Sequence, residues 1–302
     1  MPASLLYSHC DNNRIHPLDA QQLASGLNWQ FLWKTLAMKL LPPSTPSSAS
    51  VAAKLFLTGA TVGPVVDSLH NQCLLKYDIA PISLAWPSNL HSSLSSSSSY
   101  EFFFCSSWTV PPLLGIAYVV LGGVLPRFFE SLIHSEQSRH QRAKTEVGSL
   151  RTRALLAVSS TALIIKLSEF LETNPTATDS ILPLNQSDAH LSVMIMAAVS
   201  QWAILDRTIV ALLVATITAI GGPLSELPLV ANGFWEYLDQ ASDYFPLAGV
   251  SNGFLQSFLG ENYQGLALSS ITGPCYFAVT TDAIALGRWF QFQSSDDEGH
   301  QK

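Results

Sequence analysis

The side chains with the clearest chemical potential are an adjacent acid and base, Asp206 and Arg207, which lie between two long apolar runs. Each run is long enough to cross a bilayer, so the dipeptide predicts a tight turn at a membrane face. Two further ionisable residues, Lys166 and Asp282, lie within other apolar segments. Ionisable groups inside a membrane form pairs or mark a path for ions, so each of these residues is a candidate for function.

The other reactive residue types show no arrangement that is typical of an enzyme. The four cysteines are widely scattered and form no CxxC or Cys/His pair with zinc spacing, and no histidine lies in an HxxxH or HxxHH pattern. A nucleophile elbow and a phosphate-cradling glycine loop are also missing from the sequence. We therefore expect a protein that is not an enzyme and that needs neither a metal nor a cofactor.

The composition indicates a membrane protein. Of the 302 residues, 48% are hydrophobic and 12% are charged, whereas a soluble domain carries about 25% charged residues. No basic face with aromatic residues appears, so we expect no nucleic-acid partner. The apolar blocks predict an all-α polytopic fold, a bundle of six transmembrane helices. The predicted spans are residues 51–69, 108–129, 154–171, 190–205, 208–230 and 265–290.

The chain divides into three predicted parts. Residues 1–50 form an N-terminal segment with an amphipathic helix at 27–41, whose apolar residues recur at helical spacing. Residues 51–292 form the six-helix membrane domain, interrupted by a serine-rich insertion at about 88–107. Residues 293–302 form a polar tail.

The distribution of basic residues predicts the orientation. Six spans place both termini on one side, and that side carries thirteen Lys and Arg residues against Lys76 alone on the other. Cytosolic loops are enriched in Lys and Arg, so we expect both termini in the cytosol. The thirteen are Arg14, Lys34, Lys39, Lys54, Arg127, Arg139, Arg142, Lys144, Arg151, Arg153, Arg207, Arg288 and Lys302.

Several of the candidate residues also have an ordinary structural explanation. Lys166 could extend its amine to the membrane surface or pair with Glu169 on the same helix face. Asp206 could cap the helix that follows it. If Asp282 and Lys166 instead lined a common path, the protein would be a small multi-pass transporter or channel.

Short motifs in a fixed order resemble the Insig (insulin-induced gene) family of endoplasmic reticulum membrane proteins, over about residues 53–292. The motifs include LFLTG at 55–59, SWTVPP at 107–112, WAILDR at 202–207 and NGFWEY at 232–237. Lys166 with Glu169 and Phe170, Pro274–Cys275, and Gly287–Arg288 are similar to further family positions. The chain departs from the family in its serine-rich insertion and in a longer connection between the fifth and sixth helices.

The resemblance implies a non-enzymatic regulator of sterol synthesis in the endoplasmic reticulum membrane. It would bind a sterol or similar lipid and would retain or control a membrane partner, either HMG-CoA reductase or a sterol-sensing-domain protein of the Scap type. The acid of the Asp-Arg turn is required for Scap binding in the family, so the implied partner-binding residues are Asp206, Arg207 and Trp202. The candidate lipid-binding residues are His190, Gly115, Lys166 and Asn232.

Overall fold

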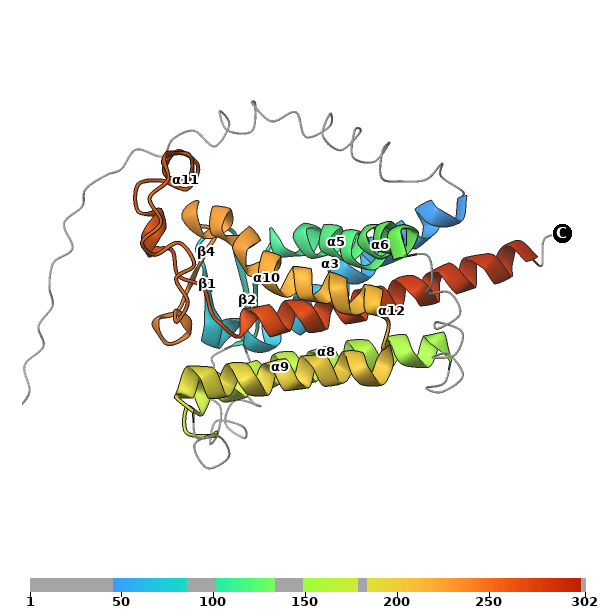
Figure 1. Cartoon of the computed structure of the whole chain (residues 1–302), viewed down its shortest axis with the longest axis horizontal. Coiled ribbons are helices and arrows are strands. Elements are labelled where there is room, and N and C mark those ends of the chain that lie inside the picture. Colours follow the sequence, from blue (N-terminus) through green and yellow to red (C-terminus); the bar gives the residue numbers. More distant parts are fainter. Residues whose placement is uncertain (1–45, 86–101, 134–148, 179–183, 300–302) are drawn as a thin grey trace, which may run out of the picture. The chain divides into compact units, whose positions relative to one another are not determined.

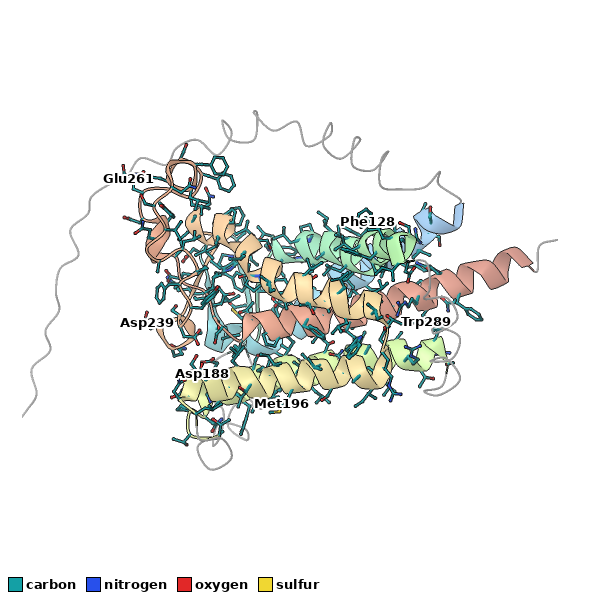
Figure 2. The ribbon with its side chains drawn as sticks, in the orientation of Figure 1. Phe128, Asp188, Met196, Asp239, Glu261 and Trp289 are labelled. Carbon is teal, nitrogen blue, oxygen red and sulfur yellow. The ribbon has the colours of Figure 1, made fainter. Side chains whose placement is uncertain are left out.

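The computed structural model describes residues 46–85, 102–133, 149–178 and 184–299, which form a mostly helical bundle (Figure 1). The predicted amphipathic helix at 27–41 and most of the serine-rich insertion lie outside the described residues. Exposed apolar side chains such as Phe128 and Met196 project from the outer helix faces (Figure 2). An apolar exterior is what a lipid-facing bundle requires, so the predicted membrane fold is confirmed.

Helices account for the six predicted apolar segments. Within the described residues, five helical segments are long and apolar enough to cross a membrane. The second of them is continuous but includes a π-helical turn, η1, between α5 and α6. The helices are α3 (Pro46–Leu74), α5 (Val110–Val119), η1 (Val120–Val124), α6 (Leu125–Ile133), α8 (Leu150–Thr173), α9 (Gln186–Leu205), α10 (Ile209–Ala231) and α12 (Thr272–Gly299).

Side-chain caps explain where three of the helices begin. Ser149, Asn185 and Thr208 precede α8, α9 and α10, and each side chain accepts a hydrogen bond from a backbone N–H in the first turn. Pro223 is expected either to end or to bend the fifth span; α10 does not end there and continues to Ala231. Proline is tolerated inside membrane helices because neighbouring groups satisfy the freed backbone carbonyl.

The sixth predicted span, α12, runs through the middle of the bundle and packs against α3, η1, α8, α9 and α10. It is not among the five apolar candidates, because polar residues such as Thr280, Thr281 and Asp282 lie within it. All three are buried, so they face protein and not lipid. That α12 crosses the membrane therefore stays a prediction, which its central position supports.

Two glycines allow α12 to approach η1 closely. A Cβ atom added to Gly287 would lie 2.0 Å from the carbonyl oxygen of Gly122, and one added to Gly122 would lie 2.3 Å from that of Ala283. Small residues of this kind let membrane helices pack backbone to backbone. The contact fixes the part of α12 that leads into Arg288.

The long connections between the predicted spans contain short elements. In the connection after α3, β1 (Leu75–Tyr77) pairs with the distant β4 (Trp235–Tyr237), and β2 (Pro81–Ala85) pairs with β3 (Phe102–Ser107). Both pairs are antiparallel. The connection before α12 contains η2 (Asp239–Ala241), α11 (Gly253–Leu259) and η3 (Tyr263–Gly265).

Most of the helices extend further than the predicted spans, and two of these extensions shorten segments that were expected to be polar connections or tails. The basic connection expected at 130–153 ends earlier, because α8 begins at Leu150 and includes Arg151 and Arg153. The polar tail expected from residue 293 is helical as far as Gly299, where α12 ends.

We name the two ends of the bundle by what they carry. The turn end carries the Asp206–Arg207 turn, and the strand end carries β1 and β4 (Figure 1). The start of α3 and the end of α12 both lie at the turn end (Figure 1). Acidic residues that include Asp188, Asp239 and Glu261 lie at the strand end (Figure 2). The side of the membrane that each end faces stays a prediction.

Candidate functional site

The Asp206–Arg207 turn is held in one conformation by its own backbone and caps. The chain reverses through Arg207, whose φ of 61° lies in the left-handed region. Thr208 then caps α10 by accepting a hydrogen bond from the N–H of Ala211, at 3.2 Å. The indole Nε1 of Trp202 donates to the carbonyl oxygen of Thr208 at 3.0 Å. Trp202 thus ties the end of α9 to the start of α10.

The carboxylate of Asp206 is buried, with 2% of its surface exposed, and both of its oxygens are occupied. Oδ1 accepts hydrogen bonds from the backbone N–H of Thr208, at 2.9 Å, and from the Thr208 hydroxyl. Oδ2 accepts a hydrogen bond from Nη1 of Arg288 on α12. Thr208, not Asp206, is the N-cap of α10, so Asp206 does not cap this helix directly; it holds the capping residue and joins the turn to α12.

A second buried cation completes the cluster from α8. Nε of Arg153 donates to the carbonyl oxygen of Leu205 at 2.6 Å, and its Nη2 lies 3.9 Å from Oδ2 of Asp206. Nη2 of Arg288 also lies 3.4 Å from Oε1 of Glu130 on α6, which is partly exposed. Two cations thus lie close to two carboxylates, and the charges balance where α6, α8, α12 and the turn between α9 and α10 meet.

Arg207 differs from its neighbours because it is exposed. Its Nε donates to the carbonyl oxygen of Ala203, one turn back in α9. The apolar side chains of Ile204 and Ile209 are exposed on either side of the turn in sequence. The turn therefore buries its acid and presents its base beside apolar surface.

The two ionisable residues of the transport hypothesis are not brought together. Asp282 is buried and accepts a hydrogen bond from the Tyr118 hydroxyl at 3.3 Å. Lys166 has 58% of its side chain exposed and pairs with Glu169 on the same helix, as one of its structural explanations predicted. Separate partners hold the two residues, one in the interior and one at the surface.

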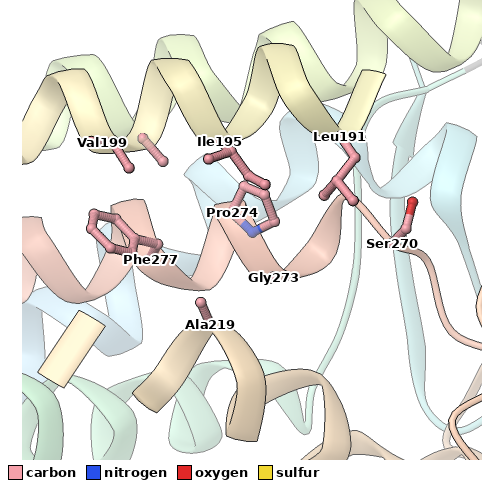
Figure 3. Close-up of a pocket in the computed structure, with 9 residues that line it drawn as sticks. Leu191, Ile195, Val199, Ala219, Ser270, Gly273, Pro274 and Phe277 are labelled. Carbon is pink, nitrogen blue, oxygen red and sulfur yellow. The ribbon is translucent and has the colours of Figure 1, made fainter. Parts of the chain in front are cut away.

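An apolar cavity of about 230 Å³ lies between α9, α10 and α12 (Figure 3). Ile195 and Val199 form part of its wall and are also exposed on the outer face of α9, so the cavity opens toward the lipid-facing surface. Its one hydroxyl belongs to Ser270. The lining residues are Leu191, Ile195, Ala198, Val199, Ala219, Ser270, Gly273, Pro274 and Phe277.

A polar group adjoins this cavity at the strand end. The Ser270 hydroxyl donates to Oδ2 of Asp243 at 2.6 Å, and the Ser270 backbone N–H donates to Oδ1 at 2.7 Å. Ser187 at the start of α9 also donates to Asp243. The cavity therefore combines an apolar wall with one hydroxyl, which is itself bonded to a carboxylate outside the lining, and ligand pockets commonly join an apolar wall to a few polar groups.

The four candidate lipid-binding residues do not gather around this cavity. His190 is buried beside Leu191, which does line it. A Cβ atom added to Gly115 would lie 2.8 Å from the ring of Phe56, so this glycine serves the packing of α5 on α3. Asn232 follows α10 and donates to the carbonyl oxygen of Pro228 at 2.6 Å.

Sequence reasoning missed the two residues that hold Asp206. Arg288 is 82 positions away, and Arg153 falls in a segment that its composition assigns to a solvated connection. The topology predicted from the sequence did indicate these two residues as possible partners of Asp206, because it places Arg153 and Arg288 on the same side of the membrane as the turn. Among the described residues, no three His, Cys, Asp or Glu side chains gather in a way that could hold a metal ion.

Comparisons with known proteins give one family match and two similar structures. The family described as insulin-induced protein (INSIG) matches residues 50–248. Two crystal structures of MvINS, an Insig homolog from Mycobacterium vanbaalenii, are similar at 17% sequence identity and a TM-score of 0.48. The similarity covers 80% of this chain and 94% of theirs, and one of them is a cross-linked trimer of a variant. No curated protein matches this chain.

Proposed function

Because this chain belongs to the insulin-induced protein (INSIG) family, we propose that it is a non-enzymatic membrane regulator of sterol synthesis. It resides in the endoplasmic reticulum with its turn end in the cytosol. It binds a sterol or similar lipid and controls a membrane partner, either HMG-CoA reductase or a sterol-sensing-domain protein. The observation that carries the proposal is the family match, which extends from α3 past the end of α10.

The cavity between α9, α10 and α12 supports the lipid part of the proposal. It is smaller than the ~300–1,000 Å³ of typical ligand sites, so it encloses part of a lipid while the rest lies in the bilayer. A ligand hydroxyl would be directed to Ser270 and Asp243, and the apolar body would lie against Ile195 and Phe277. A rigid apolar ligand with one hydroxyl suits this arrangement.

Photocrosslinking tests the lipid part. The full chain in phosphatidylcholine vesicles is irradiated with a photoreactive sterol, with and without excess unlabelled sterol. Ala219→Phe places a ring in the cavity and should lower crosslinking about fivefold or more, which corresponds to ~1 kcal/mol of binding. The matched control is Ile220→Phe, since Ile220 is exposed on the outer face of the same helix. Equal crosslinking by both variants and the wild type would contradict the site.

The Asp206–Arg207 turn supports the proposal that the protein binds a membrane partner, and its two residues have different roles. The carboxylate of Asp206 is buried and both of its oxygens already accept hydrogen bonds from within the chain, so we assign Asp206 a positioning role. Arg207 is the residue that the turn presents, and Ile204 and Ile209 add apolar contact. This surface suits a membrane helix with an apolar stripe and an acidic residue near its cytosolic end.

Strain in the backbone supports the same assignment. A left-handed residue at the end of a helix is usually glycine, because other side chains cost about 1 kcal/mol there. Here the position is occupied by Arg207. Residues with strained backbone are found at functional sites more often than elsewhere. Contact between Arg207 and a partner would explain why an arginine and not a glycine occupies this position.

Affinity purification tests the partner part. The full chain is isolated from endoplasmic reticulum membranes in a mild detergent, with and without added sterol, and bound proteins are identified by mass spectrometry. We expect HMG-CoA reductase or a sterol-sensing-domain protein, in an amount that changes with sterol. Recovery of neither protein under either condition would contradict the proposal.

A further inference from the structure

A pair of phenylalanines stands on the surface of α11, at the strand end. Phe254 and Phe258 have 73% and 58% of their surfaces exposed. Their rings are stacked, with centroids 6.0 Å apart and planes within 8° of each other. Both side chains therefore project to the same side of the helix. The helix lies outside the residues that match the family, 50–248.

The chain builds a defined support under these rings. The side chain of Asn252 caps α11 by accepting hydrogen bonds from the N–H groups of Phe254 and Leu255, at 2.9 and 3.3 Å. The buried hydroxyl of Tyr263 accepts from the Asn252 N–H at 2.9 Å and donates to the carbonyl oxygen of Val250. Capping and buried hydrogen bonds thus hold a helix that would be too short to form alone.

α11 lies beside an apolar outer face of the bundle. α11 packs against α10, whose outer face carries Ile217, Ile220 and Leu224, exposed at helical spacing. This apolar stripe belongs to the lipid-facing surface of the bundle and runs toward the strand end. α11 adjoins α10 at that end of the bundle (Figure 1), so the two exposed rings belong to an element next to this stripe.

From the exposure of the two rings and the position of α11 next to the apolar stripe of α10, we infer that Phe254 and Phe258 anchor α11 in the bilayer interface at the strand end. Residues 232–264 contain no Lys or Arg, so anionic lipids do not attract the segment. Insertion is therefore driven by burial of the two rings at the boundary of headgroups and acyl chains. The segment joins α10 to α12, so its anchorage fixes the strand end relative to the membrane surface.

The size of the patch favours lipid over a protein partner. Two phenylalanine side chains bury at most ~500 Å² together. A stable protein interface needs about 800 Å² on each partner, which α11 with its seven residues does not offer. A bilayer has no such threshold, because each apolar side chain that enters it adds its own favourable free energy.

Site-specific photocrosslinking tests this inference and identifies the occupant. p-Benzoylphenylalanine, which keeps the aromatic ring, is introduced at position 254 or 258 of the full chain. The purified protein is reconstituted in phosphatidylcholine vesicles whose acyl chains carry tritium. Gln256 is the matched control, because it is exposed on the same helix but lies on the opposite flank from the two rings.

We expect tritium incorporation at 254 and 258 to exceed that at 256 by about fivefold or more, since interfacial side chains lie ~5–10 Å into the boundary of headgroups and acyl chains. Equal incorporation at all three positions would overturn the inference. Covalent dimers without lipid adducts would also overturn it and would assign the surface to a second copy of the chain. The result does not depend on sterol or on a regulatory partner.

Discussion

The two ends of the bundle each bury a carboxylate, and they stabilise it by different chemistry. At the turn end, Asp206 pairs with the guanidinium group of Arg288, with Arg153 nearby. At the strand end, Glu226 accepts hydrogen bonds from the hydroxyls of Tyr237 and Tyr276, at 2.6 and 2.8 Å. One acid is therefore compensated by opposite charge and the other by neutral donors.

This difference indicates what each end does. Burial and the nearby Glu226 raise the pKa of the Tyr237 phenol well above its usual range, so it remains a hydrogen-bond donor at physiological pH. At the strand end, hydrogen bonds from uncharged tyrosine hydroxyls therefore join β4 and α12 to Glu226 on α10. The turn end is an ionic lock, in which Asp206, Arg288 and Arg153 join α8, α12 and the turn between α9 and α10, and the adjacent Arg207 is exposed.

The largest effect is expected when the ionic lock loses its acid. Asp206→Ala leaves the guanidinium groups of Arg288 and Arg153 buried without their carboxylate, and breaking a buried pair in this way costs about 3–5 kcal/mol. Thermal unfolding in detergent, followed by tryptophan fluorescence, should show a large fall in the midpoint. Asp206→Leu with Arg288→Met removes both partners and should recover part of the loss. A double variant less stable than Asp206→Ala would contradict the lock.

A smaller loss is expected at the strand end. Tyr237→Phe removes one hydroxyl from Glu226 but leaves the hydrogen bond from Tyr276, so the cost should be about 1–2 kcal/mol. The same unfolding measurement applies, and Tyr263→Phe, in the support of α11, offers a comparison away from Glu226. If Tyr237→Phe were as damaging as Asp206→Ala, the contrast between the two ends would fail.

The smallest change in stability is expected when backbone strain is relieved. Arg207→Gly permits the left-handed φ but loses the hydrogen bond to the carbonyl oxygen of Ala203, so stability should stay within about 1 kcal/mol of the wild type. Ala80→Gly relieves similar strain at the strand end, where Ala80 has a φ of 47°. A fall of several kcal/mol in either variant would show that the residue has a structural role that its exposure does not suggest.

The sequence predicted those parts of the fold that depend on apolar patterns. Long apolar runs located the membrane helices, and the acid–base pair between two runs located the turn, because both are local features. The short strands were missed, since three residues such as 75–77 carry no alternating pattern and pair with partners far along the chain. The support of α11 by Tyr263 was likewise beyond local reasoning.

The site was predicted only in part, for a related reason. Composition favours a solvated position for an arginine, and Arg153 is buried only because α8 packs within the bundle. Asp282 lowers the apolar character of α12, yet a helix surrounded by other helices does not need an apolar exterior. Family resemblance pointed to Asp206, but its burial and its pairing with Arg288 depend on how the helices pack, which no local pattern shows.

In the proposed function, Asp206 positions the turn and Arg207 makes the contact with the partner. The most direct test is co-purification of HMG-CoA reductase or the sterol-sensing-domain protein with Arg207→Gly, with Ala80→Gly as the matched control. Both variants must first show wild-type unfolding midpoints. We predict that Arg207→Gly loses the partner and that Ala80→Gly retains it. Full retention by a folded Arg207→Gly protein would contradict the claim.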